Sequence, residues 1–338
     1  MRNTQTLYWV WVVLLWMPLG IGCSQRVKQD AYQWDLPRGF PIPVVPRDNP
    51  MSERKVILGR KLFFDRRLSG NQTYSCASCH KPELAFTDGL RQAIGSTGEK
   101  HQFSALSLFN VAYNSSLGWV DANTRTLEDQ VHIPLFNENP IELGISGKVG
   151  EILGRLRRDS DIVSDFAVAF PNHQQPVSIT HIAKAIAAFE RTLIAADSAY
   201  DRYVYYDDKT VMSESAKRGM GLFFSERLQC SVCHQGFNFS SSVSYQGNEN
   251  TKPDFHNTGL SGEFRAPTLR NIALTAPYMH DGRFADLLEV IEHYAKGANS
   301  DSNTIVSELM VGFELNPTQR NDLVEFLRSL TSLSQRTH

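Results

Sequence analysis

Apolar residues recur at helical spacing along most of the chain, and the period-two alternation typical of half-buried strands is almost absent. The clearest amphipathic stretch is THIAKAIAAFERTLIAA within residues 179–196. Ser52 stands where the N-cap of a helix is expected. Helices are predicted at residues 52–65, 127–131, 149–157, 161–170, 179–196, 214–224, 284–295 and 317–330. The pattern therefore predicts an all-α fold.

A second pattern is a stretch that occurs twice. Residues 62–68 read LFFDRRL and residues 222–228 read LFFSERL, and each is followed by the motif C-x-x-C-H. The motif residues are Cys76, Cys79 and His80 in the first copy, and Cys230, Cys233 and His234 in the second. Cysteines three positions apart lie on one side of a helical turn, where both thiols can bond one porphyrin, and the next histidine can ligate its iron. Two zinc half-sites would leave the duplicated lead-in unexplained, so the repeat predicts two covalent c-type haems.

The repeat also predicts how the chain divides. We expect two cytochrome-c-like domains, each with one haem, at residues 46–204 and 205–338. Residues 23–45 are expected to form an extended tether that lies along the first domain, because this part of the chain is polar and rich in proline. Loops with short helices are expected at residues 82–118, and loops at residues 134–147 and 236–262.

The N-terminus resembles an export signal. Residues 7–22 form an apolar run after Arg2, too short to cross a bilayer comfortably, and residues 1–22 are therefore predicted to be a signal peptide. Cys23, the one cysteine outside the haem motifs, follows Leu-Gly-Ile-Gly as in a bacterial lipoprotein; an ordinary signal peptide is the alternative. We expect a lipid-anchored protein on the periplasmic side of the envelope, at the outer membrane. The net charge of −2 gives no electrostatic case for binding nucleic acid or an anionic membrane surface.

The strings GRKLFFDRRLS, CASCH, ALSLFNVAYN, PLFNENPIELG, FRAPTLRNIALTAPYMHDGRF and LLEVIEHY carry a resemblance that runs from about residue 50 to residue 330. In them the chain resembles the bacterial di-haem cytochrome c peroxidase/MauG family. DNPMSERKVILGRKLFFD and GSTGEKHQFSALSLFNVAYN are most similar to its MbnH branch, whose members are encoded in methanobactin operons.

The resemblance implies that the haem bound through His80 reacts with peroxide. Its acid–base residue would be Glu142, in the string Pro-Ile-Glu-Leu, with Glu138 as an alternative. Peroxidases of the family cap this haem with a histidine in an Ile-Gly-His string, but Ser96 occupies that position here. His101 is near, although its neighbours do not match. We therefore expect a haem that is open without prior reduction.

Three residues are candidates for the ligand opposite His234: Met279, Tyr294 and Met310. The family places this ligand fourteen residues after the histidine of His-Asp-Gly, a position that Tyr294 occupies, as in MauG-like enzymes. A thioether favours Fe(II), whereas a tyrosinate is a hard anionic donor that favours Fe(III) and can support Fe(IV). The resemblance therefore implies a second haem that stores an oxidising equivalent.

Other site residues follow from the resemblance. Trp119 matches a tryptophan that relays electrons between the haems, and Arg265 and Arg270 are candidate partners of haem propionates. A calcium ion between the domains would use the backbone carbonyls of Thr275 and Pro277 and the side chain of Ser104, where the family has an asparagine. A hydroxyl is a poorer calcium ligand than an amide oxygen.

The function implied is that of a MauG-like oxidase. Hydrogen peroxide would produce a high-valent, bis-Fe(IV)-type pair of haems, which oxidises an aromatic residue on a partner protein. Similarity to the MbnH branch implies tryptophan-to-kynurenine oxidation on a small, copper-binding, MbnP-like partner. The alternatives are a peroxidase that takes electrons from a small cytochrome c or cupredoxin, and a di-haem electron carrier without enzymatic activity.

Overall fold

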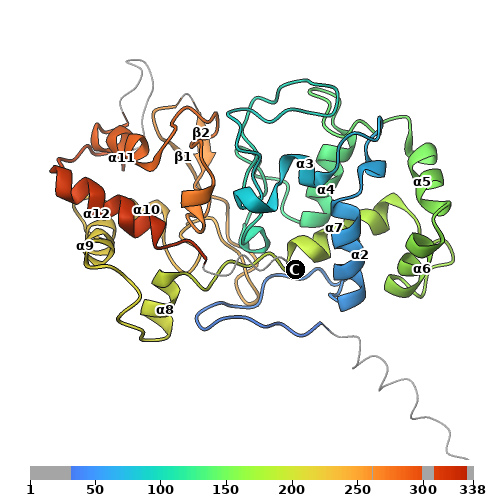
Figure 1. Cartoon of the computed structure of the whole chain (residues 1–338), viewed down its shortest axis with the longest axis horizontal. Coiled ribbons are helices and arrows are strands. Elements are labelled where there is room, and N and C mark those ends of the chain that lie inside the picture. Colours follow the sequence, from blue (N-terminus) through green and yellow to red (C-terminus); the bar gives the residue numbers. More distant parts are fainter. Residues whose placement is uncertain (1–31, 261, 299–307, 333–338) are drawn as a thin grey trace, which may run out of the picture.

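The computed structural model describes residues 32–260, 262–298 and 308–332, and helices dominate these ranges (Figure 1). The α-helices are α2 (Glu53–Phe63), α3 (Cys76–Cys79), α4 (Leu127–Phe136), α5 (Val149–Arg157), α6 (Ser160–Ala169), α7 (Ile179–Glu190), α8 (Ala199–Tyr205), α9 (Glu214–Phe223), α10 (Cys230–Cys233), α11 (Leu287–Ala295) and α12 (Pro317–Arg328). Strands β1 (Phe255–Asn257) and β2 (Glu263–Arg265) pair antiparallel. Among the described residues, no helix has both the length and the apolar character needed to cross a membrane.

The two copies of the repeat build the same helix crossing. Helix α2 packs on α7 in the first half of the chain, and α9 packs on α12 in the second. At each crossing a glycine lets two backbones approach: a β-carbon on Gly59 would collide with the carbonyl of Ala185, and one on Gly219 would collide with the carbonyl of Asp322. The repeated sequence thus encodes a repeated tertiary contact.

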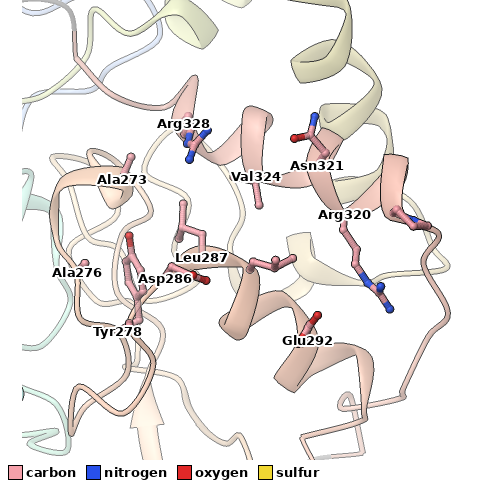
Figure 2. Close-up of a pocket in the computed structure, with 13 residues that line it drawn as sticks. Ala273, Ala276, Tyr278, Asp286, Leu287, Glu292, Arg320, Asn321, Val324 and Arg328 are labelled. Atoms are coloured by element: carbon pink, nitrogen blue, oxygen red, sulfur yellow. The ribbon is translucent and has the colours of Figure 1, made fainter.

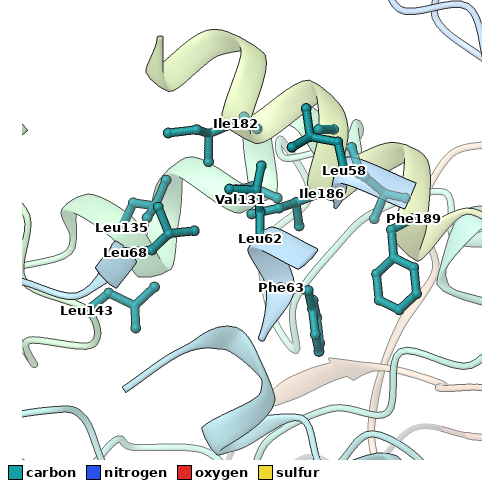
Figure 3. Packing of buried hydrophobic residues seen from close by; sticks show 14 of the residues in the cluster. Leu58, Leu62, Phe63, Leu68, Val131, Leu135, Leu143, Ile182, Ile186 and Phe189 are labelled. Carbon is teal, nitrogen blue, oxygen red and sulfur yellow. The ribbon is translucent and has the colours of Figure 1, made fainter. Parts of the chain in front are cut away.

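Two apolar clusters lie around these crossings. The first extends from Leu58 to Leu193 and includes the fully buried Phe63, whose ring lies 5.2 Å from that of Phe189 (Figure 3). The second extends from Tyr200 to Leu330. The first cysteine of each haem motif, Cys76 or Cys230, is partly buried against the cluster of its own half.

Residues 32–50 run as an extended strap against both halves of the chain. Phe40 is buried between Tyr113 of the first half and Tyr205 and Phe237 of the second. The sequence predicts a tether that lies along the first domain, and in the structure residues 32–50 also contact the second half through Phe40.

Several element boundaries differ from those predicted. Helix α4 continues through Pro134, because the next residue, Leu135, is almost completely buried in the first cluster and its packing outweighs one lost backbone hydrogen bond. Helix α7 ends at Glu190, and beyond it Asn110 Oδ1 accepts a hydrogen bond from the backbone N–H of Ala195. The predicted loop at residues 236–262 contains strand β1 and ends directly before strand β2.

Candidate haem sites

The two C-x-x-C-H motifs form short helices of the same geometry. The backbone N–H of His80 donates to the carbonyl of Cys76 at 2.9 Å, and that of His234 donates to Cys230 at 3.0 Å. The four motif cysteines are not in disulfides, and burial raises the pKa of each thiol, to about 12 for Cys79. Each pair thus presents two neutral thiols on one turn, which is the donor set that thioether attachment of a haem requires.

The rings of both motif histidines are held by backbone carbonyls, with those of Leu106 and Pro267 also near His80 and His234 respectively. His80 Nδ1 lies 2.9 Å from the carbonyl oxygen of Phe86, and His234 Nδ1 lies 3.1 Å from that of Phe239. A carbonyl only accepts, so Nδ1 carries the hydrogen and Nε2 keeps its lone pair for a metal. Burial lowers the pKa of both imidazoles, that of His234 to about 4, which keeps them neutral. Both sites therefore fit a haem iron.

A mainly apolar cavity of about 200 Å³ lies beside the second motif. His234 lines it, and so do all three candidates for the opposite ligand, Met279, Tyr294 and Met310. Burial, with the nearby Cys233 and Cys230, raises the pKa of Tyr294. The isolated side chain is therefore a neutral phenol, and a phenolate there requires an adjacent cation such as an iron.

The two arginines predicted to meet haem propionates have different surroundings. Arg265 lines the cavity with only 3% of its surface exposed, and its Nη1 is buried without a hydrogen-bond partner among the described residues. Burial lowers its pKa to about 10. Arg270 does not line the cavity: its Nη1 and Nη2 each donate to a carboxylate oxygen of Asp201 at 2.8 Å. The carboxylate of Asp201 thus accepts from both terminal nitrogens of Arg270. Of the two arginines, only Arg265 has the free donor that a propionate needs.

Trp119 connects the first half of the chain to this cavity. Its indole ring lines the cavity, and Nε1 donates to the carbonyl of Ser104 at 3.0 Å. The ring centre lies 6.4 Å from that of His280, which stacks on Phe264 at 3.8 Å. These aromatic rings form a continuous group at the contact between the two halves.

Ser104, predicted as a calcium ligand, makes direct contacts across the same interface. Its backbone N–H donates to the carbonyl of His280 at 2.7 Å, and its hydroxyl donates to that of Met279 at 3.2 Å. Met279 lies two residues beyond Pro277. The hydroxyl hydrogen is engaged there, and the neighbouring groups supply carbonyl oxygens but no carboxylate. This donor set fits Ca²⁺ poorly.

Glu142 belongs to the surroundings of the first motif. Cys79 Sγ contacts the carbonyl of Ile94 at 3.7 Å, and the N–H of Ser96 donates to the carbonyl of Glu142 at 2.8 Å. Gly95 lies between Ile94 and Ser96 in the chain, and a β-carbon on it would collide with the carbonyl of Ile141. The close approach of the two backbones at this point therefore requires glycine. Glu138, the alternative acid, is exposed and makes no side-chain contact with this group among the described residues.

One contact at this site has no counterpart in the sequence prediction. His101 Nε2 lies 3.2 Å from Glu142 Oε1, an ion-pair distance at angles outside those of a hydrogen bond. The carboxylate raises the pKa of His101, while burial opposes that shift. No spacing in the sequence indicates this contact, because it joins a hairpin to a distant loop.

A groove of about 620 Å³ lies on the outer side of the second cavity, between α11 and α12 (Figure 2). Tyr278 and Leu287 line both the groove and the cavity, so their side chains form the wall between them. Arg320, Arg328 and Glu292 surround the groove. Solvent thus comes within one side chain of the second cavity.

Comparisons with known proteins agree with this organisation. A family model described as di-haem cytochrome c peroxidase matches residues 53–209, and one described as cytochrome c matches residues 216–331. The methylamine utilization protein MauG of Methylorubrum extorquens is 32% identical over 293 residues, covering 84% of this chain and 80% of that protein. Cytochrome c551 peroxidase of Pseudomonas aeruginosa is 32% identical over 305 residues, covering 86% and 82%.

A crystal structure of a MauG-like protein associated with microbial copper homeostasis is 40% identical, with a TM-score of 0.85 over 90% of this chain and 97% of that one. The duplicated haem motif, the helix crossings and these relatives lead to one conclusion. The chain belongs to the di-haem cytochrome c peroxidase/MauG family and is a peroxide-dependent di-haem oxidoreductase.

Proposed function

We propose that this enzyme uses hydrogen peroxide to oxidise an aromatic side chain of a partner protein. The observation that carries the proposal is Tyr294, which lines the second cavity together with His234 at the position where peroxidases of the family have methionine. When bound, the two haems supply a peroxide-binding iron and a second iron that shares the oxidising equivalents. As a phenolate, Tyr294 would stabilise an oxidised second iron and so favour storage over immediate electron uptake.

Three residues of the chain have distinct roles in the proposal. Glu142 accepts a proton from one peroxide oxygen and returns it to the other, which leaves as water. Trp119, which lines the second cavity and donates to Ser104 of the first half, would carry electrons from one site to the other. Arg265 neutralises a propionate with its unpartnered Nη1.

We propose a small copper-binding protein of the MbnP type as the partner, and conversion of one of its tryptophans to kynurenine as the reaction. The MauG-like relative associated with microbial copper homeostasis supports this choice. Insertion of two oxygen atoms into the indole consumes two peroxides and releases two waters. Hydrolysis of the formyl product then releases formate and leaves kynurenine.

Mass spectrometry tests the proposal. The candidate partner is treated with the enzyme and peroxide, and its tryptophan peptides are compared with those from reactions lacking either component. A mass increase of two oxygens on one tryptophan, and then the kynurenine mass, is expected only in the full reaction. Unmodified tryptophan, with peroxide consumed only when reduced cytochrome c is present, contradicts it.

A peroxidase is the second candidate function. Met279 and Met310 line the same cavity as Tyr294, so the cavity also contains the soft ligands that suit an electron-receiving haem. In that case peroxide is reduced to water with electrons from a small cytochrome c or cupredoxin. Rapid turnover with such a donor, and no stable oxidised state in its absence, distinguishes this function.

We also propose that the enzyme works on the periplasmic side of the envelope, anchored by a lipid on Cys23, which lies outside the described residues. The two haem-carrying units correspond to residues 46–204 and 205–338. Labelling with a radioactive fatty acid tests the anchor, and a Cys23→Ser variant is the control. Because Ser104 fits Ca²⁺ poorly, the proposal gives calcium no role in the reaction.

A further inference from the structure

The segment that reaches Glu142 is a hairpin formed by residues 93–103. The backbone N–H of Ala93 donates to the carbonyl of Phe103 at 3.0 Å, and that of His101 donates to Ala93 at 2.7 Å. Nearer the turn, the N–H of Gly95 donates to the carbonyl of Glu99 at 2.8 Å. The outgoing arm contacts Cys79 and the backbone of Glu142, and the return arm carries His101. The hairpin thus fixes the histidine relative to both the haem motif and the carboxylate.

Glu142 is held from one side only. Its Oε1 lies 3.2 Å from His101 Nε2 and 3.4 Å from Asn137 Nδ2. Its Oε2 has no hydrogen-bond partner among the described residues. The side chains of His101 and Glu142 are about a quarter exposed, at 23% and 25%. One carboxylate oxygen therefore lies next to two nitrogens, and the other is available to exchange a proton.

We propose that His101 is a positioning residue for Glu142, an inference that rests on the proposed acid–base role of that carboxylate. His101 and Asn137 fix Oε1, which directs Oε2 toward a ligand bound at the first iron. A carboxylate without these contacts samples several rotamers, and each rotamer that turns Oε2 away removes the base from the reacting oxygen.

The affinity of the ferric protein for fluoride depends on the position of Glu142 Oε2 and can be measured without turnover. Fluoride binds at the iron together with a proton that the nearby base retains, so its affinity depends on where Oε2 points. The dissociation constant is measured from the visible spectrum at one pH for the holoenzyme and for the variants His101→Leu and His101→Gln. His101→Leu removes the ring nitrogen next to Oε1, whereas His101→Gln places an amide nitrogen there. His173→Leu, at an exposed histidine that contacts Phe170 and His181, is the matched control.

We expect His101→Leu to weaken fluoride binding about tenfold and to slow the reaction with peroxide by about ten- to a hundredfold. His101→Gln should recover most of both losses, and His173→Leu should change neither. The variant Glu142→Gln distinguishes failure of the positioning role of His101 from failure of the acid–base role of Glu142. If Glu142→Gln weakens fluoride binding but His101→Leu does not, the role of His101 is overturned and that of Glu142 stands. If Glu142→Gln also binds fluoride normally, the acid–base role itself is overturned.

Because the leucine variant can disturb the hairpin, a second measurement accompanies it. Haem content and the thermal midpoint are compared among all four variants. A loss of affinity in His101→Leu at unchanged stability supports the proposal. A loss that the glutamine variant fails to recover contradicts it, since a donor at this position would then be insufficient.

Discussion

Arg270 and Asp201 form a bidentate ion pair whose two side chains are almost completely removed from solvent, at 1% and 0% exposure. Arg270 also donates through Nε to the carbonyl of Phe237, and its guanidinium lies 4.6 Å from the centre of the Phe40 ring. The pair therefore joins α8, the segment after the second haem motif and the strap at residues 32–50. It is a structural ion pair between elements distant in sequence.

This pair gives the first prediction. Asp201→Asn should lower the free energy of unfolding by about 3–5 kcal/mol, because it leaves the Arg270 charge buried without its counter-charge. Chemical denaturation followed by circular dichroism measures the change. Arg202→Gln, which removes a neighbouring exposed partner of Asp208, should cost less than about 1 kcal/mol. Equal effects of the two substitutions would be inconsistent with a buried pair.

The second prediction concerns the glycines of the repeated helix crossing. Gly219→Ala should destabilise the protein by about 1–3 kcal/mol, because the new methyl group meets the carbonyl of Asp322. Gly221 lies in the same helix, and a β-carbon there would meet no atom within 4 Å, so Gly221→Ala should instead stabilise by about 0.5–1 kcal/mol. Gly59→Ala should repeat the destabilisation in the first half. The three unfolding curves, compared at one pH, check the sign of each effect.

Tyr294 gives the third prediction. Tyr294→Met should raise the reduction potential of the second haem by on the order of 100 mV and abolish the near-infrared charge-resonance band expected after peroxide addition. Met310→Leu, a change in the same cavity, should leave the band in place. Redox titration and near-infrared spectra check both. A band that survives in Tyr294→Met but disappears in Met310→Leu would assign the ligand to methionine.

Glu190 gives a prediction about pH. Its carboxyl is buried with Oε2 unpartnered among the described residues, and burial raises its pKa to about 8 from the ordinary value of 4.5. Between these values the unfolded chain has released the proton that the folded chain retains, so stability falls as pH rises through this window. Glu190→Gln should remove that fall. Denaturation midpoints at several pH values measure it, and parallel profiles for the two proteins would refute the assignment.

The last prediction concerns calcium. Since a hydroxyl is a poorer calcium ligand than the amide oxygen of an asparagine, removing calcium with a chelator should leave haem spectra and the peroxide reaction of the native protein unchanged. Ser104→Asn restores an amide oxygen and should introduce measurable calcium binding by isothermal titration calorimetry. Calcium binding by the native protein at comparable affinity would show that a hydroxyl suffices at this position.

Local signals in the sequence predict much of the fold and both haem motifs. The haem motif and helix α5 depend on neighbours within a few residues, and their predicted positions agree with the structure. The predicted helix at residues 127–131 is shorter than α4, because the tertiary packing of Leu135 overrides the local effect of Pro134. Helix propensity depends on local residues alone and therefore does not include the effect of that packing.

At the candidate site, too, the local sequence motifs could be predicted, whereas the contacts between distant residues could not. The sequence predicts Arg270 at a propionate because an arginine in a haem protein is a plausible partner, but its actual partner is Asp201, 69 positions away. The neighbours of His101 in the sequence do not match the family and so give it no role. Its contact with Glu142 exists only once the hairpin has folded against the loop. Pairings of this kind depend on tertiary contacts and leave no periodic trace in a single sequence.

The position of Phe40 has a consequence for the order of assembly. This residue is synthesised early, yet one of the rings that bury it, Phe237, follows the second haem motif and leaves the ribosome much later. The first half can complete its own core beforehand, because α2 and α7 both precede residue 200. The packing around Phe40 therefore requires that the second half has already been made and brought Tyr205 and Phe237 into place.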